Sequence, residues 1–111
     1  MDLVLENRVV GPWSVVRVSG ELDLHTSPQL RDHVLSMIGD QPVRLALDLS
    51  DVGFMDSSSL GMLVTVLKRV RERDGDLRLV GVTGSPMKVF SLTGLDRVFE
   101  ISDTAEDLPQ G

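Results

Sequence analysis

Three consecutive hydroxyls, Ser57, Ser58 and Ser59, follow Asp56 and open a stretch with apolar residues at helical spacing. This order is typical of a helix N-terminus, where Asp and Ser accept hydrogen bonds from free backbone N–H groups. Two interpretations remain: the serines are simply favourable first-turn residues, or one of them accepts a phosphoryl group. A phosphate there adds about −1.5 to −2 charges beside the positive end of the helix dipole, so the fold would tolerate it.

The residue that caps this helix decides which hydroxyl is free. If Asp56 is the N-cap, Met55 precedes it and Leu60 lies four positions into the helix, which is the spacing of a hydrophobic staple. If Ser57 were the cap, the corresponding pair would be Asp56 and Gly61, which cannot pack. We therefore predict that Asp56 caps the helix and that Ser57 is a first-turn residue with an unused hydroxyl.

The sequence gives little support for catalysis, metal binding or nucleotide binding. Ser57, His25 and either Asp23 or Asp48 match no familiar catalytic triad, and no Gly-x-Ser-x-Gly elbow is present. The histidines and carboxylates are scattered without metal-ligand spacing. Residues 81–84 have neither the lysine nor the length of a phosphate-binding loop. The sequence therefore predicts a protein that is not an enzyme and holds no cofactor or metal.

Composition and charge restrict the number of domains, the classes of partner and the compartment of this protein. The 111 residues suit one domain, 1–111, and 41% of them are hydrophobic. The formal net charge of −6 repels phosphate backbones and anionic lipids, so nucleic acid and membranes are disfavoured as partners. Cysteine is absent, no apolar run approaches the roughly 20 residues that span a bilayer, and no signal peptide is visible. These features predict a cytoplasmic protein.

The elements that must position the serines alternate between strand and helix. β-branched and apolar stretches predict strands over residues 3–9, 13–19, 43–49, 77–82 and 98–101. Cap, proline and glycine signals predict helices that begin near Thr26-Ser27, Asp56 and Ser85 and end near Gly39, Gly75 and Gly94. Residues 103–111 form either a partial helical turn or a loose tail.

This order predicts an α/β fold, with a mixed sheet of four or five strands and three main helices. Helical crossovers join parallel strands, whereas the Gly11-Pro12 turn closes an antiparallel hairpin at the N-terminal edge. Because functional loops gather at the carboxyl ends of parallel strands, we expect residues 20–26, 50–56 and 81–84 at one end of the sheet. This places Ser57 with an acidic and polar group of side chains, namely Glu21, Asp23, His25, Asp51 and Asp56.

Three segments together resemble the STAS-domain anti-sigma factor antagonists. Residues 54–61 (FMDSSSLG) are similar to the family signature Met-Asp-Ser-Ser/Thr-Gly-Leu-Gly. Residues 20–26 (GELDLHT) resemble its Gly-Glu-Leu-Asp loop, and residues 85–95 (SPMKVFSLTGL) resemble its Ser-Pro helix. The segments come in the family's order and spacing and cover nearly the whole chain. One departure is Ser59, which stands where the family usually has Gly and adds a Cβ and a third hydroxyl.

The resemblance implies a phosphorylation switch. Family members bind an anti-sigma factor that is itself a serine kinase, and this binding releases the sigma factor. The kinase, which supplies the ATP, phosphorylates the serine after the Asp, and a PP2C-type phosphatase reverses the step. By this match Ser57 is the phosphoacceptor, with Ser58 as the runner-up. Asp23 and Asp56 match the acidic residues expected beside Ser57 at the kinase contact.

Met62 and Val66 lie on the flank of the second helix, away from its main apolar stripe. Either they pack beneath a neighbouring helix, or they form part of an apolar patch that contacts the partner beside Ser57. A second functional class also remains, a STAS scaffold or transport-accessory subunit without a kinase cycle. The intact Asp56-Ser57 pair favours the phosphorylation-switched antagonist.

Overall fold

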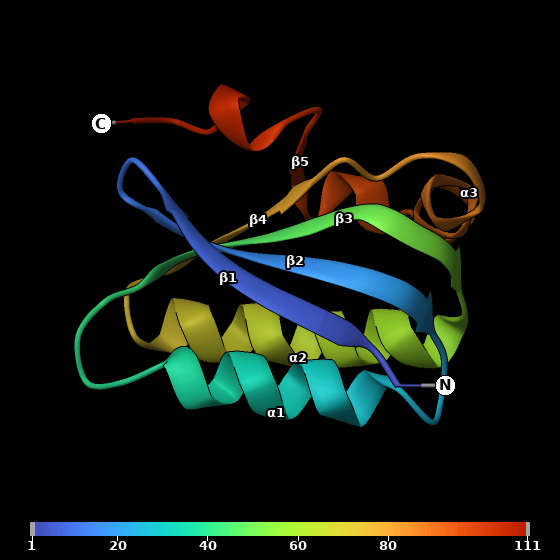
Figure 1. The fold of residues 1–111 in the computed structure, drawn as a ribbon, viewed down its shortest axis with the longest axis horizontal. Helices are drawn as coiled ribbons and strands as arrows, with labels where there is room; N and C mark the ends of the chain where they lie inside the picture. The colour runs from blue at the N-terminus through green and yellow to red at the C-terminus, as the bar shows by residue number, and fades with distance from the viewer. Residues whose placement is uncertain (1, 111) are drawn as a thin grey trace.

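The fold is seen in a computed structural model that describes residues 2–110. Five strands form one sheet in chain order: β1 (Val4–Val10), β2 (Trp13–Leu22), β3 (Arg44–Met55), β4 (Asp76–Val80) and β5 (Glu100–Ser102). β1 and β2 are antiparallel, and every other neighbouring pair is parallel. The predicted mixed sheet with an antiparallel N-terminal hairpin at its edge is confirmed (Figure 1).

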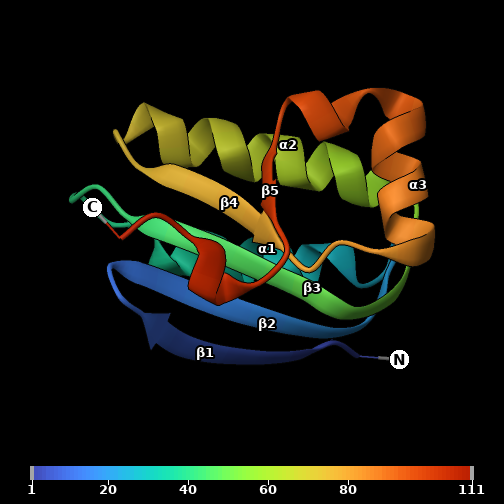
Figure 2. The ribbon, with the colours of Figure 1, turned by 90° about the horizontal axis from the view of Figure 1, so that it is seen from above.

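Three main helices connect the parallel strands, as predicted: α1 (Ser27–Met37), α2 (Ser57–Glu72) and α3 (Gly84–Thr93). α1 and α2 lie side by side under one face of the sheet, and α3 packs near the end of β3 (Figures 1 and 2). On α2, the apolar residues at helical spacing face the sheet, so Leu60, Leu63, Leu67 and Val70 are buried. The main core therefore fills the space between the helices and the sheet.

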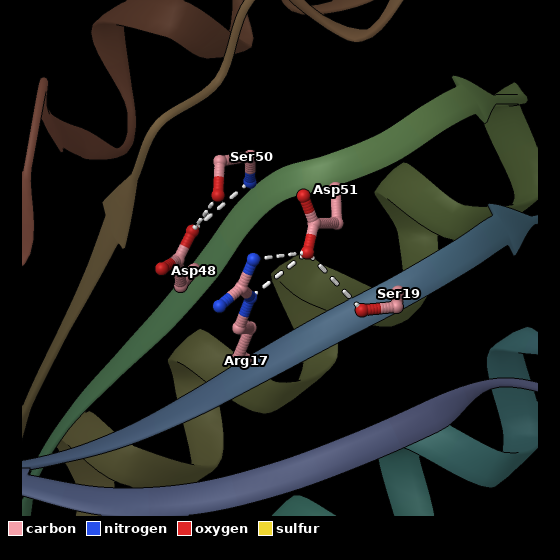
Figure 3. Close-up of polar contacts among 5 residues, drawn as sticks. All are labelled: Arg17, Ser19, Asp48, Ser50 and Asp51. Atoms are coloured by element: carbon pink, nitrogen blue, oxygen red, sulfur yellow. Dashed lines mark hydrogen bonds and ion pairs between the residues drawn. The ribbon is translucent and has the colours of Figure 1, made fainter.

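β3 is longer than predicted and corrects the expected loop over residues 50–56. The strand continues past Leu49 to Met55, and Met55 pairs with Leu22 of β2. Two register shifts interrupt this pairing, which is how a strand with polar residues and a glycine stays in the sheet. Asp51 consequently lies in the sheet opposite Ser19, and not in a loop next to Ser57. It accepts a 2.8 Å hydrogen bond from Arg17 Nε (Figure 3).

The starts of α1 and α3 differ in detail from the cap-then-proline pattern. Thr26 occupies the N-cap of α1, but its hydroxyl donates to the backbone oxygen of Glu21 and does not cap the helix. At α3, Thr83 is the N-cap and Ser85 lies inside the first turn. Proline still marks both starts, because its missing N–H is free of a helical partner there.

The predicted helix stops are confirmed only at α3. Gly94 ends α3 with a φ of 75°, in the left-handed region. α1 ends at Met37, before Gly39, and after α2 the positive φ belongs to Asp74. Gly75 is required for a different reason, since a Cβ there would lie 2.4 Å from the backbone oxygen of Val43.

The C-terminal segment packs on the face of the sheet opposite α1 and α2 (Figure 1). Its single 3-10 turn, Ala105–Asp107, is the partial helical turn predicted as one alternative. Ala105 and Leu108 join a small second core with four sheet residues, namely Trp13, Val15, Ala46 and Val80. Trp13 Nε1 also donates a 2.6 Å hydrogen bond to the backbone oxygen of Pro109. The described part of the tail is therefore attached to the sheet.

Candidate functional site

Asp56 caps α2, as predicted from the staple spacing. Its backbone is extended, and its Oδ1 accepts hydrogen bonds from Ser59 N at 3.1 Å and Ser58 Oγ at 2.6 Å. Met55 and Leu60, the two staple residues, are both buried in the main core. The end of β3 and the start of α2 are thus held by a polar cap on one side and apolar packing on the other.

The three serines after Asp56 have different environments. Ser57 is exposed, and its hydroxyl makes no hydrogen bond within residues 2–110. Ser58 is also exposed, but its hydroxyl donates to Asp56. Ser59 is fully buried, with its Oγ 2.7 Å from Ser27 Oγ on α1. The extra Cβ and hydroxyl at Ser59 therefore face α1 in the interior.

Asp23 is built into the loop between β2 and α1. Its Oδ1 accepts hydrogen bonds from His25 N at 2.8 Å and Thr26 N at 2.9 Å, as in an Asx turn. Its backbone oxygen accepts from Ser27 N at 2.9 Å. Oδ2 receives no hydrogen bond within residues 2–110. Asp23 is half-buried and has a structural role in addition to the partner contact predicted for it.

Two hydrogen-bonded connections join the Asp23 loop to the start of α2. Asp56 N donates to the backbone oxygen of Leu22 at 3.1 Å. The Ser27 hydroxyl donates its proton to the backbone oxygen of Asp23 at 2.6 Å, and its oxygen lies 2.7 Å from Ser59 Oγ, which in turn lies 3.2 Å from Asp56 Oδ1. Hydrogen bonds therefore connect the loop to the helix start that carries Ser57.

Both carboxylates of this surface stay ionised at neutral pH. The Thr26 backbone N–H lowers the pKa of Asp23, with help from the N–H of His25. At Asp56, partial burial raises the pKa, but hydrogen bonds from Ser58 and Ser59 outweigh it and leave the pKa lowered. The Ser57 neighbourhood is thus negatively charged before any modification.

The two side chains predicted to contact a partner, Met62 and Val66, have different environments in the structure. Val66 is fully buried in the main core, so the prediction that it contacts a partner is wrong and the packing alternative is correct. Met62 is also largely buried, at 9% exposure. It lines a groove of about 290 Å³ between α1 and α2, together with Leu24 and Pro28. The apolar surface near Ser57 is therefore made by other residues.

Two of those residues, Leu24 and Phe54, were not singled out from the sequence. Leu24 is 68% exposed in the β2–α1 loop, and Phe54 is 44% exposed on β3. Phe54 pairs with Glu21 of β2, one position before the Met55–Leu22 pair that leads into Asp56. In the sequence, each of these two residues is an apolar side chain directly beside polar residues. The apolar and polar alternation of a strand does not require such a side chain, and this could have marked both residues as exposed.

Comparison with known proteins agrees with this geometry. The model of the STAS domain family matches residues 4–108. The anti-sigma-B factor antagonist of Staphylococcus aureus (strain NCTC 8325 / PS 47) is 31% identical over 106 residues, which cover 96% of this chain and 98% of the relative. The chain belongs to the STAS-domain family of anti-sigma factor antagonists. Members of this family are regulators without enzymatic activity.

Solved structures of anti-sigma factor antagonists have the same fold. One from Mycobacterium paratuberculosis is 30% identical, with a TM-score of 0.83 over 95% of this chain and 89% of the other. SpoIIAA in its unphosphorylated form is 27% identical, with a TM-score of 0.77 over 95% and 90% of the two chains. The same Bacillus cell fate determinant has also been solved in a phosphorylated form, with a TM-score of 0.70 over 95% and 94%.

Residues 2–110 contain no helix long and apolar enough to cross a membrane. That part of the chain also brings no three His, Asp or Glu side chains together in an arrangement suited to a metal ion.

Proposed function

We propose that this cytoplasmic antagonist binds an anti-sigma factor that is a serine kinase and thereby frees a sigma factor. Phosphorylation of Ser57 by that kinase ends the interaction, and a PP2C-type phosphatase restores it. The observation that carries the proposal is the difference among the three serines. Ser57 alone combines exposure with an unused hydroxyl, whereas Ser58 is hydrogen-bonded to the cap and Ser59 is buried.

The position of Ser57 suits a modification that changes binding and leaves the fold intact. It is the first residue of the 16-residue helix α2, where the free backbone N–H groups favour negative charge. The ionised Asp23 and Asp56 already make the adjoining surface negative. A phosphate adds charge to that surface, so a partner that fits the unmodified form meets new repulsion.

The contact surface for the kinase consists of the helix start and the Asp23 loop. Asp23 Oδ2 and the exposed Ser58 supply polar contacts, and Leu24 and Phe54 supply apolar area. Exposed aromatic and aliphatic side chains surrounded by polar groups are typical of interaction sites. Met62 contributes only the floor of the adjoining groove.

Phosphosite mapping on matched variants tests the proposal. The chain is incubated with an anti-sigma serine kinase of the same organism and ATP, and the modification is followed by intact-mass and fragment spectra. We expect one phosphate on the wild type and on Ser58→Ala, and none on Ser57→Ala. Calorimetry with the unmodified Ser57→Ala chain should show kinase binding close to that of wild type.

The isolated chain serves as the control in the same experiment. Without the kinase it should neither hydrolyse ATP nor bind it with micromolar affinity, because the nucleotide comes with the partner. Phosphate on Ser58 with Ser57 unmodified would overturn the assignment of the acceptor. No phosphate and no kinase binding by any variant would favour a STAS scaffold without a kinase cycle.

A further inference from the structure

The β1 strand forms a long free edge of the sheet. It has seven residues, and no element of the described residues 2–110 lies beyond it in the view from above (Figure 2). α1 runs behind the inner strands, and its His33 Nε2 lies 2.8 Å from Asn7 Oδ1, so α1 contacts one face of β1 and leaves the backbone edge open. Two of the exposed large hydrophobic side chains of the molecule belong to β1, namely Val4 at 55% exposure and Val9 at 76%. An edge of this kind is a ready template for pairing with another chain.

The hairpin register shows which backbone groups face outward. Val10 pairs with Trp13 across the two-residue turn, and such a pair exchanges both of its backbone hydrogen bonds. Hydrogen-bonded pairs then alternate along β1, so the backbone groups of Val10 and of every second residue before it point to β2. The N–H and C=O groups of Leu5, Asn7 and Val9 point to the free edge.

The sequence of β1, VLENRVV, is complementary to itself when two copies run antiparallel about Asn7. In that register Glu6 lies opposite Arg8 of the second copy, and Leu5 lies opposite Val9. The outward backbone groups of one copy meet those of the other as hydrogen-bonded pairs. Glu6 and Arg8 form the non-hydrogen-bonded pairs, in which side chains approach more closely.

We propose that a second copy of this chain pairs antiparallel along β1, with the two-fold axis at Asn7, and joins the two sheets into one. The interface is isologous, because the same strand is offered by both copies. Val4 lines a pocket together with Glu21 and Asp23, so the start of β1 lies beside the Asp23 loop.

Charge complementarity favours β1 of a second copy as the strand that pairs with this edge. Charged residues on an edge strand usually prevent pairing, but opposite charges placed symmetrically about the centre attract in a self-pair. Glu6 also faces Arg17 of β2, which in turn binds Asp51 of β3 (Figure 3). Arg8 of the second copy therefore adds a cation next to Glu6, and the charges along this row alternate in sign.

Burial of apolar surface acts in the same direction. Val9, largely exposed in one copy, gains Leu5 of the second copy as its cross-strand neighbour. Val4 gains Val10 in the same way. An edge-to-edge contact buries little surface area, and the formal net charge of −6 on each chain opposes association. The dimer should therefore form as the protein concentration rises. Low concentrations of added salt should favour the dimer, because salt screens the long-range repulsion between the two chains.

Sedimentation equilibrium over a concentration series tests the pairing. The wild type should approach twice the 12.2 kDa mass of one chain. Glu6→Arg and Arg8→Glu each place like charges opposite one another twice, and the dissociation constant should rise about tenfold or more. An equimolar mixture of these two variants restores opposite charges at both positions, so it should dimerise again. The double exchange E6R/R8E in one chain should also dimerise.

Controls with the same charge changes lie near the opposite edge of the sheet, at the exposed Asp96 and Arg97 beside α3 and β5. Asp96→Arg and Arg97→Glu should dimerise like the wild type. Circular dichroism checks folding, and if Glu6→Arg unfolds beside Arg17, then Arg8→Glu carries the test. A wild type that stays monomeric at the highest attainable concentration overturns the proposal. So does a mixture that stays monomeric, or a dimer that both single variants retain unchanged.

Discussion

At the scale of single residues, the proposed switch depends on a difference in hydrogen bonding among three neighbouring serines. Ser57, Ser58 and Ser59 carry the same hydroxyl, but only the first is both exposed and free. The cause is the cap, because Asp56 accepts from Ser58 Oγ and Ser59 N and so engages the second and third serines. A kinase that extends its active site to this loop therefore meets one available nucleophile.

Replacing Ser57 with Asp should abolish high-affinity kinase binding. Phosphate takes the formal charge from −6 to about −8, and Asp supplies one of those charges at the same place. Two like charges about 4 Å apart repel by roughly 4 kcal/mol at an effective dielectric constant near 20, or about a thousandfold in affinity. Calorimetry against the kinase measures the loss, which should be smaller for Asp than for phosphate and should shrink with added salt.

Ser57→Ala is the matched control for this substitution, since it removes the hydroxyl without adding charge. Circular dichroism should show that both variants fold, because negative charge in the first turn of a helix is favourable. Binding of Ser57→Asp with wild-type affinity would show that the helix start is not part of the kinase contact.

At the scale of elements, the buried Ser27–Ser59 pair joins the starts of α1 and α2. This pair explains how the chain accommodates a serine where the family usually has glycine. The side chain of Ser59 fills space between the two helices, with its hydroxyl 2.7 Å from Ser27 Oγ and 3.2 Å from Asp56 Oδ1. The same contact connects α2 to the loop that carries Asp23.

Ser59→Gly should destabilise the fold by about 1 to 2 kcal/mol and leave phosphorylation of Ser57 intact. The loss combines the backbone entropy of glycine in a helix with a missing hydrogen bond. Urea unfolding measures the stability, and intact-mass spectra with kinase and ATP measure the modification. Ser59→Ala is the control, because it removes the hydroxyl and keeps the helix propensity. A large drop in the phosphorylation rate of folded Ser59→Gly would place Ser59 in the kinase contact.

At the scale of the whole molecule, stability should fall in acid because two structural carboxylates titrate. Asp23 and Asp56 have pKa values below their ordinary range, since hydrogen bonds favour their charged forms. Their stabilising contribution is complete above the unfolded pKa of about 3.9 and is lost as the pH falls through the folded values. The free energy of unfolding should therefore decline below about pH 4.

Asp56→Asn tests this origin of the acid sensitivity. Asparagine caps a helix about as well as Asp but does not titrate, so the variant should keep most of its stability near pH 7. Urea midpoints measured from pH 7 down to acid should fall less steeply for the variant than for the wild type. Asp56→Ser, which also keeps a capping oxygen, should behave alike. Parallel curves for wild type and both variants would assign the acid loss to other groups.

Much of this protein follows from local patterns in the sequence. The order of strands and helices, the Asp56 cap and the Gly94 stop depend on neighbours within a few residues, and the structure confirms them. The local signal was weak where polar residues lie in a strand, so β3 was expected to end six residues too early, at Leu49. Pairing with β2 keeps this segment extended despite its polar residues.

Only the tertiary structure decided which surface surrounds Ser57. It turned Val66 inward, because α2 is covered along that flank by its neighbours, and it buried Ser59 against α1. It also moved Asp51 to the sheet surface and left Leu24 and Phe54 exposed. Periodicity shows which residues share one face of an element. What covers that face depends on contacts between residues far apart in the chain, such as Ser27 and Ser59.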